Sequence, residues 1–339
     1  MTEAGPLRIA FVGTGAIAHQ HARAIAEVSS LELRGVFDRD RARAEAFAHT
    51  FRAPRRYETW QELLADDGID CVAVLVPPDA HLQLTIDALR AGRDALCEKP
   101  LARTVADCDR MLAEAERSGR LLLPGHNRVH DPALARMGEI VRDGVLGKVF
   151  LARSNGFEPP SLLDRVPWLR TEVSLGGVLI GQAVHAAYLL RWLLGPIEAV
   201  QAARVRDNTV EMTREDTAVV TVQFASGAIG ALTATFAVGR GPNDHGVELF
   251  GTDGYLHASW REGSGRLTGV VPSVTSDDGL HELPVGKGSS FSGLWADAAG
   301  ALRREHEPRQ SAADGRAAVA VIEAAYRSIA EQRTVRPAA

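Results

Sequence analysis

The sequence predicts an α/β protein, with an N-terminal doubly wound parallel sheet and a C-terminal α+β domain that has an open, mainly antiparallel sheet. Three observations lead to this prediction. A glycine-rich turn follows the first apolar segment, predicted strands and helices alternate to residue 125, and beyond a predicted helix at 177–194 the strands follow one another directly. Alternating elements are typical of a parallel sheet, and strands gathered together are typical of an α+β domain. We therefore predict two domains, residues 1–125 and 126–339.

The predicted first domain has its clearest element at residues 70–76. This segment is continuous in apolar and β-branched residues, as parallel strands buried on both faces are. Helices predicted at 80–91 and 104–118 each end at a glycine, a residue favoured where helices stop. The other predicted elements are strands at 7–12, 32–37, 94–98 and 120–124, a helix ending near Val28 and a helix at 40–50.

The predicted second domain contains few helices and many strands. A turn at Ser226-Gly227 joins two alternating segments, which indicates that they pair as antiparallel neighbours. Apolar residues and threonines mix in these segments, a pattern that favours a covered face over a solvated one, so we expect a homodimer or homotetramer through this sheet. The predicted helices are 131–142, 177–194, 292–304 and 312–331, the predicted strands are 197–206, 216–224, 228–237, 246–251 and 254–258, and the threonines are Thr217, Thr221, Thr233 and Thr235.

Composition excludes several classes of partner. Of the 339 residues, 45% are hydrophobic and 24% are charged, as in ordinary globular proteins. A net charge of -5 argues against nucleic acid, and no apolar run approaches the roughly 18 residues that would span a membrane. The first residues lack the features of a signal peptide, and the three cysteines (Cys71, Cys97 and Cys108) lack the spacing of metal ligands. We expect a cytoplasmic protein that holds no metal and acts on a small molecule.

The glycine-rich turn fits the dinucleotide-binding pattern G-x-G-x-x-G/A. Its residues are Gly13, Thr14, Gly15, Ala16, Ile17 and Ala18. Gly13 permits a tight turn, Gly15 lets backbone N–H groups approach a pyrophosphate, and the small Ala18 allows the helix to pack closely on the strand. The alternative is a glycine turn with a helix-capping aspartate and no nucleotide, which the strand–turn–helix context disfavours.

Two residues at the end of the second strand bear on the identity of the cofactor. Asp38 lies 20 residues after Ala18, where a carboxylate can accept a hydrogen bond from a ribose 2′-hydroxyl. Arg39 follows it, and a guanidinium there can accommodate the 2′-phosphate of NADP, which Asp38 repels. We expect NAD, with the use of NADP left open. Pro77 and Pro78 stiffen a loop that could border the nicotinamide.

Residues at three other positions could contact a ligand or act in the reaction. His81, in the first turn of a predicted helix, is equally suited to a structural role and to facing a ligand. Lys99 follows a strand and points to the crevice where α/β sheets bind ligands. His185 is the first ionisable residue of an otherwise apolar helix, with Gly181 one turn before it and Tyr188 one turn after. Lys99 and His185 would supply what an alcohol oxidation needs, a group that removes the hydroxyl proton and one that stabilises the alkoxide. The alternative for His185 is an ordinary core residue.

In their order and spacing, these motifs resemble the Gfo/Idh/MocA family of glucose–fructose oxidoreductase, inositol dehydrogenase and related sugar dehydrogenases. The resemblance spans nearly the whole chain. It rests on Gly13–Ala18, Pro77-Pro78 with His81, Glu98-Lys99-Pro100, His126-Asn127-Arg128 with Pro132, Gly144–Val149, Gly176–Gly195, Gly251–Gly254 and Asp314–Ser328. It implies an N-terminal Rossmann domain, an open sheet that pairs in dimers, and an NAD(P)-dependent oxidoreductase acting on a secondary alcohol or ketone of a sugar, cyclitol or sugar derivative.

The resemblance also implies roles for particular residues. His185 would be the acid/base, Lys99 would contact the substrate hydroxyl or the nicotinamide ribose, and Asn127 would lie near the nicotinamide. The expected cofactor contacts are Gly13, Thr14, Gly15, Ala16, Ile17, Asp38, Arg39, Pro77, Pro78, His81, Glu98, Lys99, Asn127, Trp168 and Arg170, and the expected substrate contacts are Lys99, Gln182, His185 and Tyr188.

The chain departs from the family pattern on the catalytic helix. Many members carry an aspartate or asparagine four residues before the histidine and an acidic residue three after it, where this chain has Gly181 and Tyr188. The carboxylate that would orient His185 is missing, and we expect Tyr188, Gln182 or water to replace it. Two alternatives to a simple dehydrogenase stay open: elimination or epimerisation with transient oxidation, and a nucleotide-responsive regulatory protein.

Overall fold

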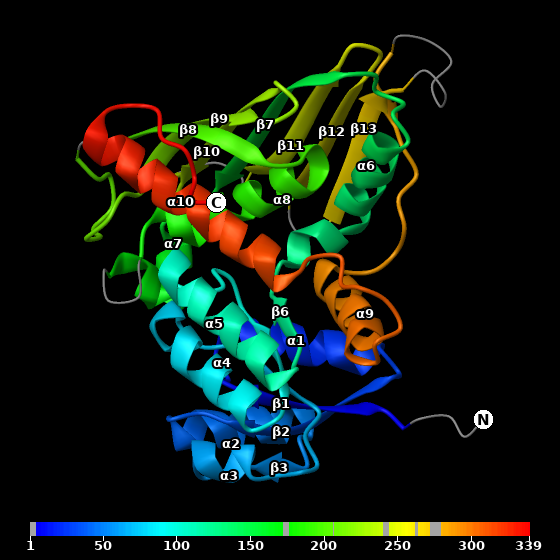
Figure 1. The fold of residues 1–339 in the computed structure, drawn as a ribbon, viewed down its shortest axis with the longest axis vertical. Helices are drawn as coiled ribbons and strands as arrows, with labels where there is room; N and C mark the ends of the chain where they lie inside the picture. Colours follow the sequence, from blue (N-terminus) through cyan, green and yellow to red (C-terminus); the bar gives the residue numbers. More distant parts are fainter. Residues whose placement is uncertain (1–4, 172–175, 206, 240–243, 262–263, 272–278) are drawn as a thin grey trace. The chain divides into compact units, whose positions relative to one another are not determined.

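The computed structural model describes residues 5–171, 176–205, 207–239, 244–261, 264–271 and 279–339 (Figure 1). The chain divides into two compact units. Unit 1 is Met1–Asn127 with Ser289–Arg316, and unit 2 is Arg128–Gly288 with Ala317–Ala339. This division differs from the predicted one, because part of the region 126–339 belongs to the first unit.

Unit 1 contains a six-stranded parallel sheet, which confirms the doubly wound fold predicted for this half of the chain. Its strand order is β3-β2-β1-β4-β5-β6, so the direction of the winding reverses between β1 and β4. In such sheets, ligands bind beyond the carboxyl ends of the strands at this reversal. The strands are β1 (Leu7–Val12), β2 (Leu31–Phe37), β3 (Arg55–Arg56), β4 (Cys71–Val74), β5 (Asp94–Cys97) and β6 (Leu122–Pro124).

Helices connect these strands. They are α1 (Ala16–Glu27), α2 (Arg41–Phe51), α3 (Trp60–Leu64), α4 (His81–Arg90) and α5 (Val105–Ser118). All strands and helices predicted for this half are present, with ends shifted by two residues or fewer. The short β3 and α3 were not predicted, because two to five residues carry too little periodicity to be recognised.

Helix α9 (Ser290–Leu302) comes from far along the chain and packs against α1 in unit 1. Trp295 is fully buried, and Leu294 and Ala298 belong to the same hydrophobic cluster as Ile9 and Phe11 of β1. Ser289 caps this helix in a capping box. The sequence assigned α9 to the second domain because it follows that domain in the chain, whereas its apolar face completes the core of the first.

Unit 2 is built on an eight-stranded sheet in the order β14-β13-β12-β11-β7-β10-β9-β8. β7 and β10 are parallel, and the other neighbouring pairs are antiparallel, which confirms the mainly antiparallel sheet. The strands are β7 (Val149–Phe157), β8 (Ile197–Arg204), β9 (Thr217–Phe224), β10 (Ile229–Thr235), β11 (Asp244–Gly251), β12 (Tyr255–Arg261), β13 (Ser264–Val270) and β14 (His281–Glu282). Of these, β7, β13 and β14 were not predicted.

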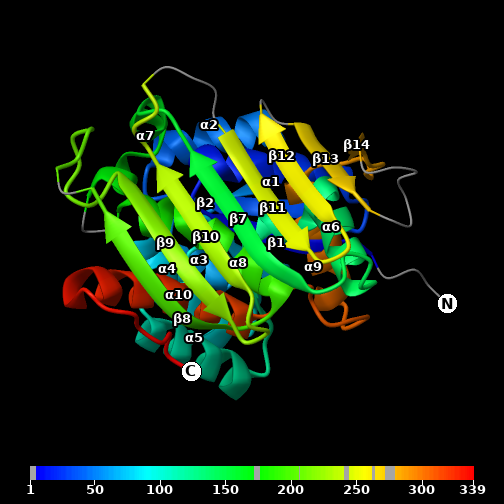
Figure 2. The ribbon, with the colours of Figure 1, turned by 90° about the horizontal axis from the view of Figure 1, so that it is seen from above.

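Helices of unit 2 cover one face of its sheet (Figures 1 and 2). They are α6 (Pro132–Arg142), α8 (Val184–Leu194) and α10 (Ala312–Glu331), the last from Ala317 onward, and α7 (Ser161–Arg165) lies beyond the end of β7. A turn of π-helix at Leu179–Ala183 leads into α8. The opposite face of the sheet is turned to the viewer in Figure 2. Val219 of β9 and Ile229 of β10 are half exposed and alternate with buried residues, so they lie on this face. Among the described helices, none is long and apolar enough to cross a membrane.

Candidate functional site

The turn between β1 and α1 has the geometry that the dinucleotide-binding pattern requires. Gly13 has a φ of +92°, and a Cβ there would lie 2.5 Å from the carbonyl oxygen of Leu75, so a larger residue does not fit. A Cβ on Gly15 would meet nothing within 4 Å. The space beside Gly15 is therefore open to a ligand that approaches the backbone.

The N-terminus of α1 is available to an anion. Gly15 is the N-cap, it provides no side-chain cap, and the first turn contains no acidic residue. The backbone N–H groups of Ala16 and Ile17 make no hydrogen bond to any other described residue. Unpaired N–H groups and the helix dipole together favour a phosphate at this position.

Asp38 connects the end of β2 to the glycine turn. Its Oδ2 accepts hydrogen bonds from Thr14 N at 2.8 Å and Thr14 Oγ1 at 2.9 Å, and its Oδ1 accepts one from Asp40 N at 2.9 Å. Thr14 is only 1% exposed. Thr14 therefore supports the turn through Asp38, and its predicted contact with the cofactor stays a prediction.

A shallow depression of about 400 Å³ lies beside Asp38. Arg39, Tyr57 and Trp60 contribute to its lining. The Arg39 side chain forms no ion pair with another described residue, whereas the neighbouring Arg41 pairs with a glutamate. Glu58 also lines the depression, but it pairs with Arg41 and Arg56. Asp38 and the unpaired Arg39 are the two groups on which the choice between NAD and NADP was predicted to depend.

His81 does not face a ligand. Its side chain is fully buried, with Nδ1 2.8 Å from Pro100 O and Nε2 2.8 Å from Val76 O. Burial lowers the pKa of this imidazole, since desolvation disfavours the charged ring. The predicted cofactor contact of His81 is therefore wrong, and the residue instead ties the loop after β4 to the segment after β5. In that loop Pro77 is partly exposed, whereas Pro78 is buried.

Glu98, at the end of β5, is also enclosed by protein groups. Its Oε1 lies 2.8 Å from His21 Nε2, its Oε2 accepts a hydrogen bond from Lys99 N at 2.9 Å, and it is 6% exposed. Burial raises the pKa of this carboxyl, but the hydrogen bond from His21 and the charges around it outweigh burial, and the net shift is downward. The structure gives Glu98 a role in holding Lys99 in place of the predicted cofactor contact. Lys99 itself is partly exposed.

Two further predicted cofactor residues have side-chain partners in the protein. The Asn127 amide donates to Ser290 Oγ at 3.0 Å within unit 1. Arg170 donates to Asp164 Oδ1 at 2.8 Å and lies, with Trp168, in a short 3-10 turn of unit 2. These contacts fix the side chains in place, and their predicted contacts with the cofactor stay predictions.

His185 lies at the start of α8 and is held by Tyr188. Its Nδ1 is 2.8 Å from Tyr188 Oη, which also accepts a hydrogen bond from Arg128 N at 3.1 Å. Of the three alternatives for orienting His185, the structure therefore shows Tyr188. Because Tyr188 is only 1% exposed, its predicted contact with substrate is corrected to this positioning role.

Close packing explains the glycine that replaces the usual carboxylate or amide. A Cβ on Gly181 would lie 2.5 Å from Leu169 Cδ2 and 3.2 Å from Phe236 Cζ. An aspartate at this position would require Leu169 to move. In this chain Leu169 and Phe236 occupy the space beside the helix that the family's orienting carboxylate would need.

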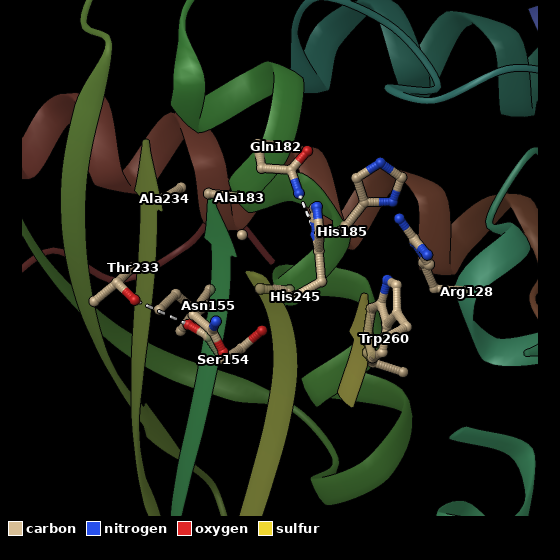
Figure 3. A pocket seen from close by; sticks show the side chains of 14 residues that line it. Arg128, Ser154, Asn155, Gln182, Ala183, His185, Thr233, Ala234, His245 and Trp260 are labelled. Carbon is tan, nitrogen blue, oxygen red and sulfur yellow. Dashed lines mark hydrogen bonds between the residues drawn. The ribbon is translucent and has the colours of Figure 1, made fainter. Parts of the chain in front are cut away.

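A pocket within unit 2 gathers the polar residues near His185 (Figure 3). Gln182 and His185 reach it from the helical segment, and Arg128, His245 and Trp260 line it from elsewhere. The space that its 14 lining residues enclose is about 20 Å³, room for about one water-sized group. Gly156 of β7 makes room for Gln182, because a Cβ there would lie 2.6 Å from the Gln182 amide nitrogen.

Hydrogen bonds fix His245 on both sides of its ring. Gln182 Nε2 lies 3.1 Å from His245 Nδ1, and His245 Nε2 lies 2.9 Å from Glu158 Oε1. The His245 ring stacks on the Trp260 indole at a centroid distance of 6.0 Å. The guanidinium carbon of Arg128 lies 4.9 Å from the centroid of the same indole. His245 and Arg128 therefore both lie against the Trp260 indole at the pocket wall.

Four residues of this pocket region had no role predicted from the sequence: Arg128, Glu158, His245 and Trp260. His245 and Trp260 occupy paired positions on β11 and β12, 15 residues apart in the chain, so only the strand register brings them together. Alternation of polar and apolar residues in β11 would have been the one available signal. Among the described residues, no group of three or more histidine, cysteine, aspartate or glutamate side chains is placed to hold a metal ion.

Two family models match the chain. One, described as an oxidoreductase family with an NAD-binding Rossmann fold, matches residues 7–126. The other, described as the GFO/IDH/MocA C-terminal domain, matches residues 134–257. The two matched regions contain the open helix N-terminus, Lys99, His185 and most of the pocket.

Curated proteins and solved structures give consistent matches. The myo-inositol 2-dehydrogenase of Thermotoga maritima is 30% identical over 261 residues, which cover 74% of this chain and 75% of that protein. The D-apiose dehydrogenase of Paraburkholderia graminis is 26% identical over 337 residues, 96% of this chain and 88% of that protein. The structure of GenD2 from gentamicin A biosynthesis in complex with NAD superposes with a TM-score of 0.85 at 29% identity, covering 100% of this chain and 98% of that chain.

Proposed function

Because the chain belongs to the GFO/IDH/MocA oxidoreductase family, we propose that it transfers a hydride between NAD and a secondary alcohol or ketone of a sugar, cyclitol or sugar derivative. The observation that carries this proposal is His185, held by Tyr188 at a polar pocket in a chain that also has an NAD-binding Rossmann domain. The names of the relatives, inositol and apiose dehydrogenases, support a polyhydroxylated substrate.

The residues of unit 1 fit a bound NAD. The open space beside Gly15 and the unpaired N–H groups of Ala16 and Ile17 suit its pyrophosphate. Asp38, which already holds the turn, suits a ribose hydroxyl. When bound, NAD accepts the hydride from the carbinol carbon as the carbonyl forms.

We assign the proton transfer to His185. In the tautomer protonated on Nδ1, that N–H donates to Tyr188 Oη, and Nε2 accepts the proton of the substrate hydroxyl. Lys99 provides a compact positive charge that stabilises the substrate oxygen as negative charge develops on it. In the reverse direction the same two residues return the proton and stabilise the same oxygen.

The test mixes the protein with NAD and a panel of cyclitols, aldoses and nucleotide sugars and follows the absorbance of reduced nicotinamide. Net reduction with at least one polyol supports the proposal. A tightly held NAD, no net reduction and an epimerised or dehydrated product would instead identify transient oxidation. NAD binding with neither net reduction nor product from any compound would favour a regulatory protein.

We further propose a cytoplasmic homo-oligomer that assembles through the sheet of unit 2. Val219 and Ile229, each about half exposed on the face without helices, support this assembly. Cys71, Cys97 and Cys108 are buried free thiols, and such thiols suit a reducing compartment.

A further inference from the structure

We propose that the substrate carries a carboxylate, and that Arg128 and the indole N–H of Trp260 bind this group at the wall of the unit 2 pocket. The proposal rests on the proposed function and names the class of substrate: acidic sugars or polyols such as uronic and aldonic acids. It follows from the charge and the hydrogen-bonding state of the residues around the pocket.

Arg128 is a fixed cation with unused donors. Its guanidinium carbon lies 4.9 Å from the centroid of the Trp260 ring, and the side chain forms neither a hydrogen bond nor an ion pair with another described residue. Stacking on an aromatic face leaves the N–H groups along the edge of a guanidinium available. That edge matches the two oxygens of a carboxylate.

Carboxylates near Arg128 have other partners. The 14 described lining residues include no aspartate and no glutamate. Asp131, the nearest acidic residue in the chain, accepts hydrogen bonds from Ala133 N and Leu134 N as the N-cap of α6. Glu158 faces His245 Nε2 at 2.9 Å. Asp131 also interacts electrostatically with Arg128 but forms no ion pair with it, and the described residues of the pocket wall itself include no carboxylate.

Trp260 provides a second donor. Its Nε1 is buried and has no hydrogen-bond partner in the part of the chain that the structure describes. A buried N–H without an acceptor is destabilising, and a ligand oxygen would supply the missing acceptor. His245, stacked on the same indole, is saturated by Gln182 and Glu158, so it adds a flat wall without a further acceptor.

The size of the enclosed space defines which part of the substrate it takes. About 20 Å³ admits a small terminal group and excludes a whole sugar ring. A carboxylate at the end of a polyol, or on C6 of a hexose, is such a group. The pocket therefore recognises the end of the substrate, while the ring or chain lies outside the enclosed space.

The experiment compares matched pairs that differ only at one terminal group. These are D-glucuronate with D-glucose, D-galacturonate with D-galactose and D-gluconate with D-sorbitol, each assayed with NAD. In at least one pair, kcat/KM for the acid should exceed that for the neutral partner by roughly 10- to 100-fold, as expected for a charge-assisted bidentate contact. Arg128→Met should remove this preference mainly through KM, Arg128→Lys should retain part of it, and Trp260→Phe should reduce it several-fold.

Arg153→Met is the matched control. This arginine lies on β7 of the same sheet, is exposed, and pairs with Glu248 at 3.2 Å. The preference for acids should survive in it. Thermal midpoints of all variants show whether each is folded, and a second readout, the rise in midpoint that each sugar causes with NADH present, measures binding independently of turnover.

The outcomes separate this proposal from the proposed function. Turnover of neutral sugars that equals or exceeds turnover of their acids overturns the carboxylate and leaves the dehydrogenase intact. The carboxylate proposal is also overturned if a folded Arg128→Met variant loses kcat/KM equally for the acid and the neutral member of each pair. If no compound is turned over, the dehydrogenase proposal fails for this panel, and the carboxylate is then judged by whether acids alone raise the midpoint of the wild type and lose that effect in Arg128→Met.

Discussion

His21 lies 77 positions before Glu98, yet its Nε2 is 2.8 Å from the Glu98 carboxylate. Trp295 fixes the tautomer, because an indole N–H can only donate and it lies 3.0 Å from His21 Nδ1. The Nε2 proton therefore donates to Glu98, whose other oxygen accepts from Lys99 N. Segments from α9, α1 and the end of β5 together set the position of the proposed catalytic lysine.

Trp295→Phe is expected to disturb Lys99 without touching a ligand. The change leaves His21 Nδ1 as a buried acceptor without a donor, which lowers the free energy of unfolding by about 1–3 kcal/mol. We expect kcat to fall while the Kd for NAD stays near the wild-type value, since the N-terminus of α1 is unchanged. Urea unfolding, turnover and calorimetric NAD binding on one preparation measure these quantities.

Trp60→Phe is the control for this prediction. It removes an indole N–H that donates to Asp87 Oδ2 at 3.3 Å in the same unit, away from His21. An equal fall of kcat in both variants would mean that the effect is general destabilisation rather than a displaced Lys99.

His185→Ala is expected to lower turnover by about 10²–10⁴-fold, the usual value of general acid–base catalysis. Tyr188→Phe removes the hydroxyl that holds His185 and should lower kcat by a smaller factor, with NAD affinity retained in both variants. Turnover and thermal midpoint are measured together. A folded and fully active His185→Ala variant would show that this histidine is only a core residue.

Asp38→Asn keeps an oxygen that can accept from Thr14 and removes the negative charge. The change removes the repulsion between the Asp38 carboxylate and the 2′-phosphate of NADP, which is about 1–4 kcal/mol at a few ångströms. The affinity for NADP relative to NAD should therefore rise by roughly tenfold or more. Initial rates with both cofactors give the ratio. Arg39→Ala in the same background should reverse the gain, and a wild-type protein that already prefers NADP would contradict the role of Asp38.

His126 makes stability depend on pH in a defined window. It is buried, its Nδ1 lies 2.8 Å from Gln310 Oε1, and burial lowers its pKa to about 4 from a usual value of 6.5. Because the unfolded chain binds the proton more readily, neutral His126 contributes fully to the free energy of unfolding above pH 6.5. This contribution, about 3 kcal/mol in all, is lost as the pH falls toward 4. Urea unfolding across this range measures how steeply the free energy of unfolding depends on pH. This dependence should be the same in the wild type and in His49→Gln, a control at an exposed histidine, and weaker in His126→Gln.

The proposed oligomer depends on the uncovered face of the unit 2 sheet. Ile229→Glu or Val219→Glu places a charge among half-exposed apolar side chains and should shift the protein toward monomers by light scattering. Leu280→Glu changes an exposed leucine outside the strands and should leave the mass of the oligomer in light scattering unchanged. A wild-type protein that is strictly monomeric at micromolar concentration would refute the assembly.

Local patterns made the nucleotide end of the molecule predictable. The glycine turn, Asp38 and the alternating elements all lie within short stretches whose residue types determine their geometry. His81 was ambiguous from sequence because its two carbonyl partners, Val76 and Pro100, become its neighbours only when two loops fold together.

The pocket of unit 2 was largely invisible to sequence reasoning. β7 lies at the centre of its sheet, but its second half, Arg153 to Gly156, consists of residues that are poor or unremarkable strand formers. Ser154, Asn155 and Gly156 line the pocket, where Gly156 accommodates the amide of Gln182. The pairing of Gln182 with His245 spans 63 positions and is created by the register of β7 with β11.

The return of α9 to unit 1 has a consequence for synthesis of the protein. Domains are generally able to fold as they emerge from the ribosome, the N-terminal one first. Here the first sheet is complete at residue 124, but the core of that unit still lacks Leu294, Trp295 and Ala298. The face of α1 that buries His21 therefore stays without its cover until nine-tenths of the chain has been translated. During that interval the nascent nucleotide-binding unit exposes apolar surface, and a truncation before Ser290 would leave it in that state permanently.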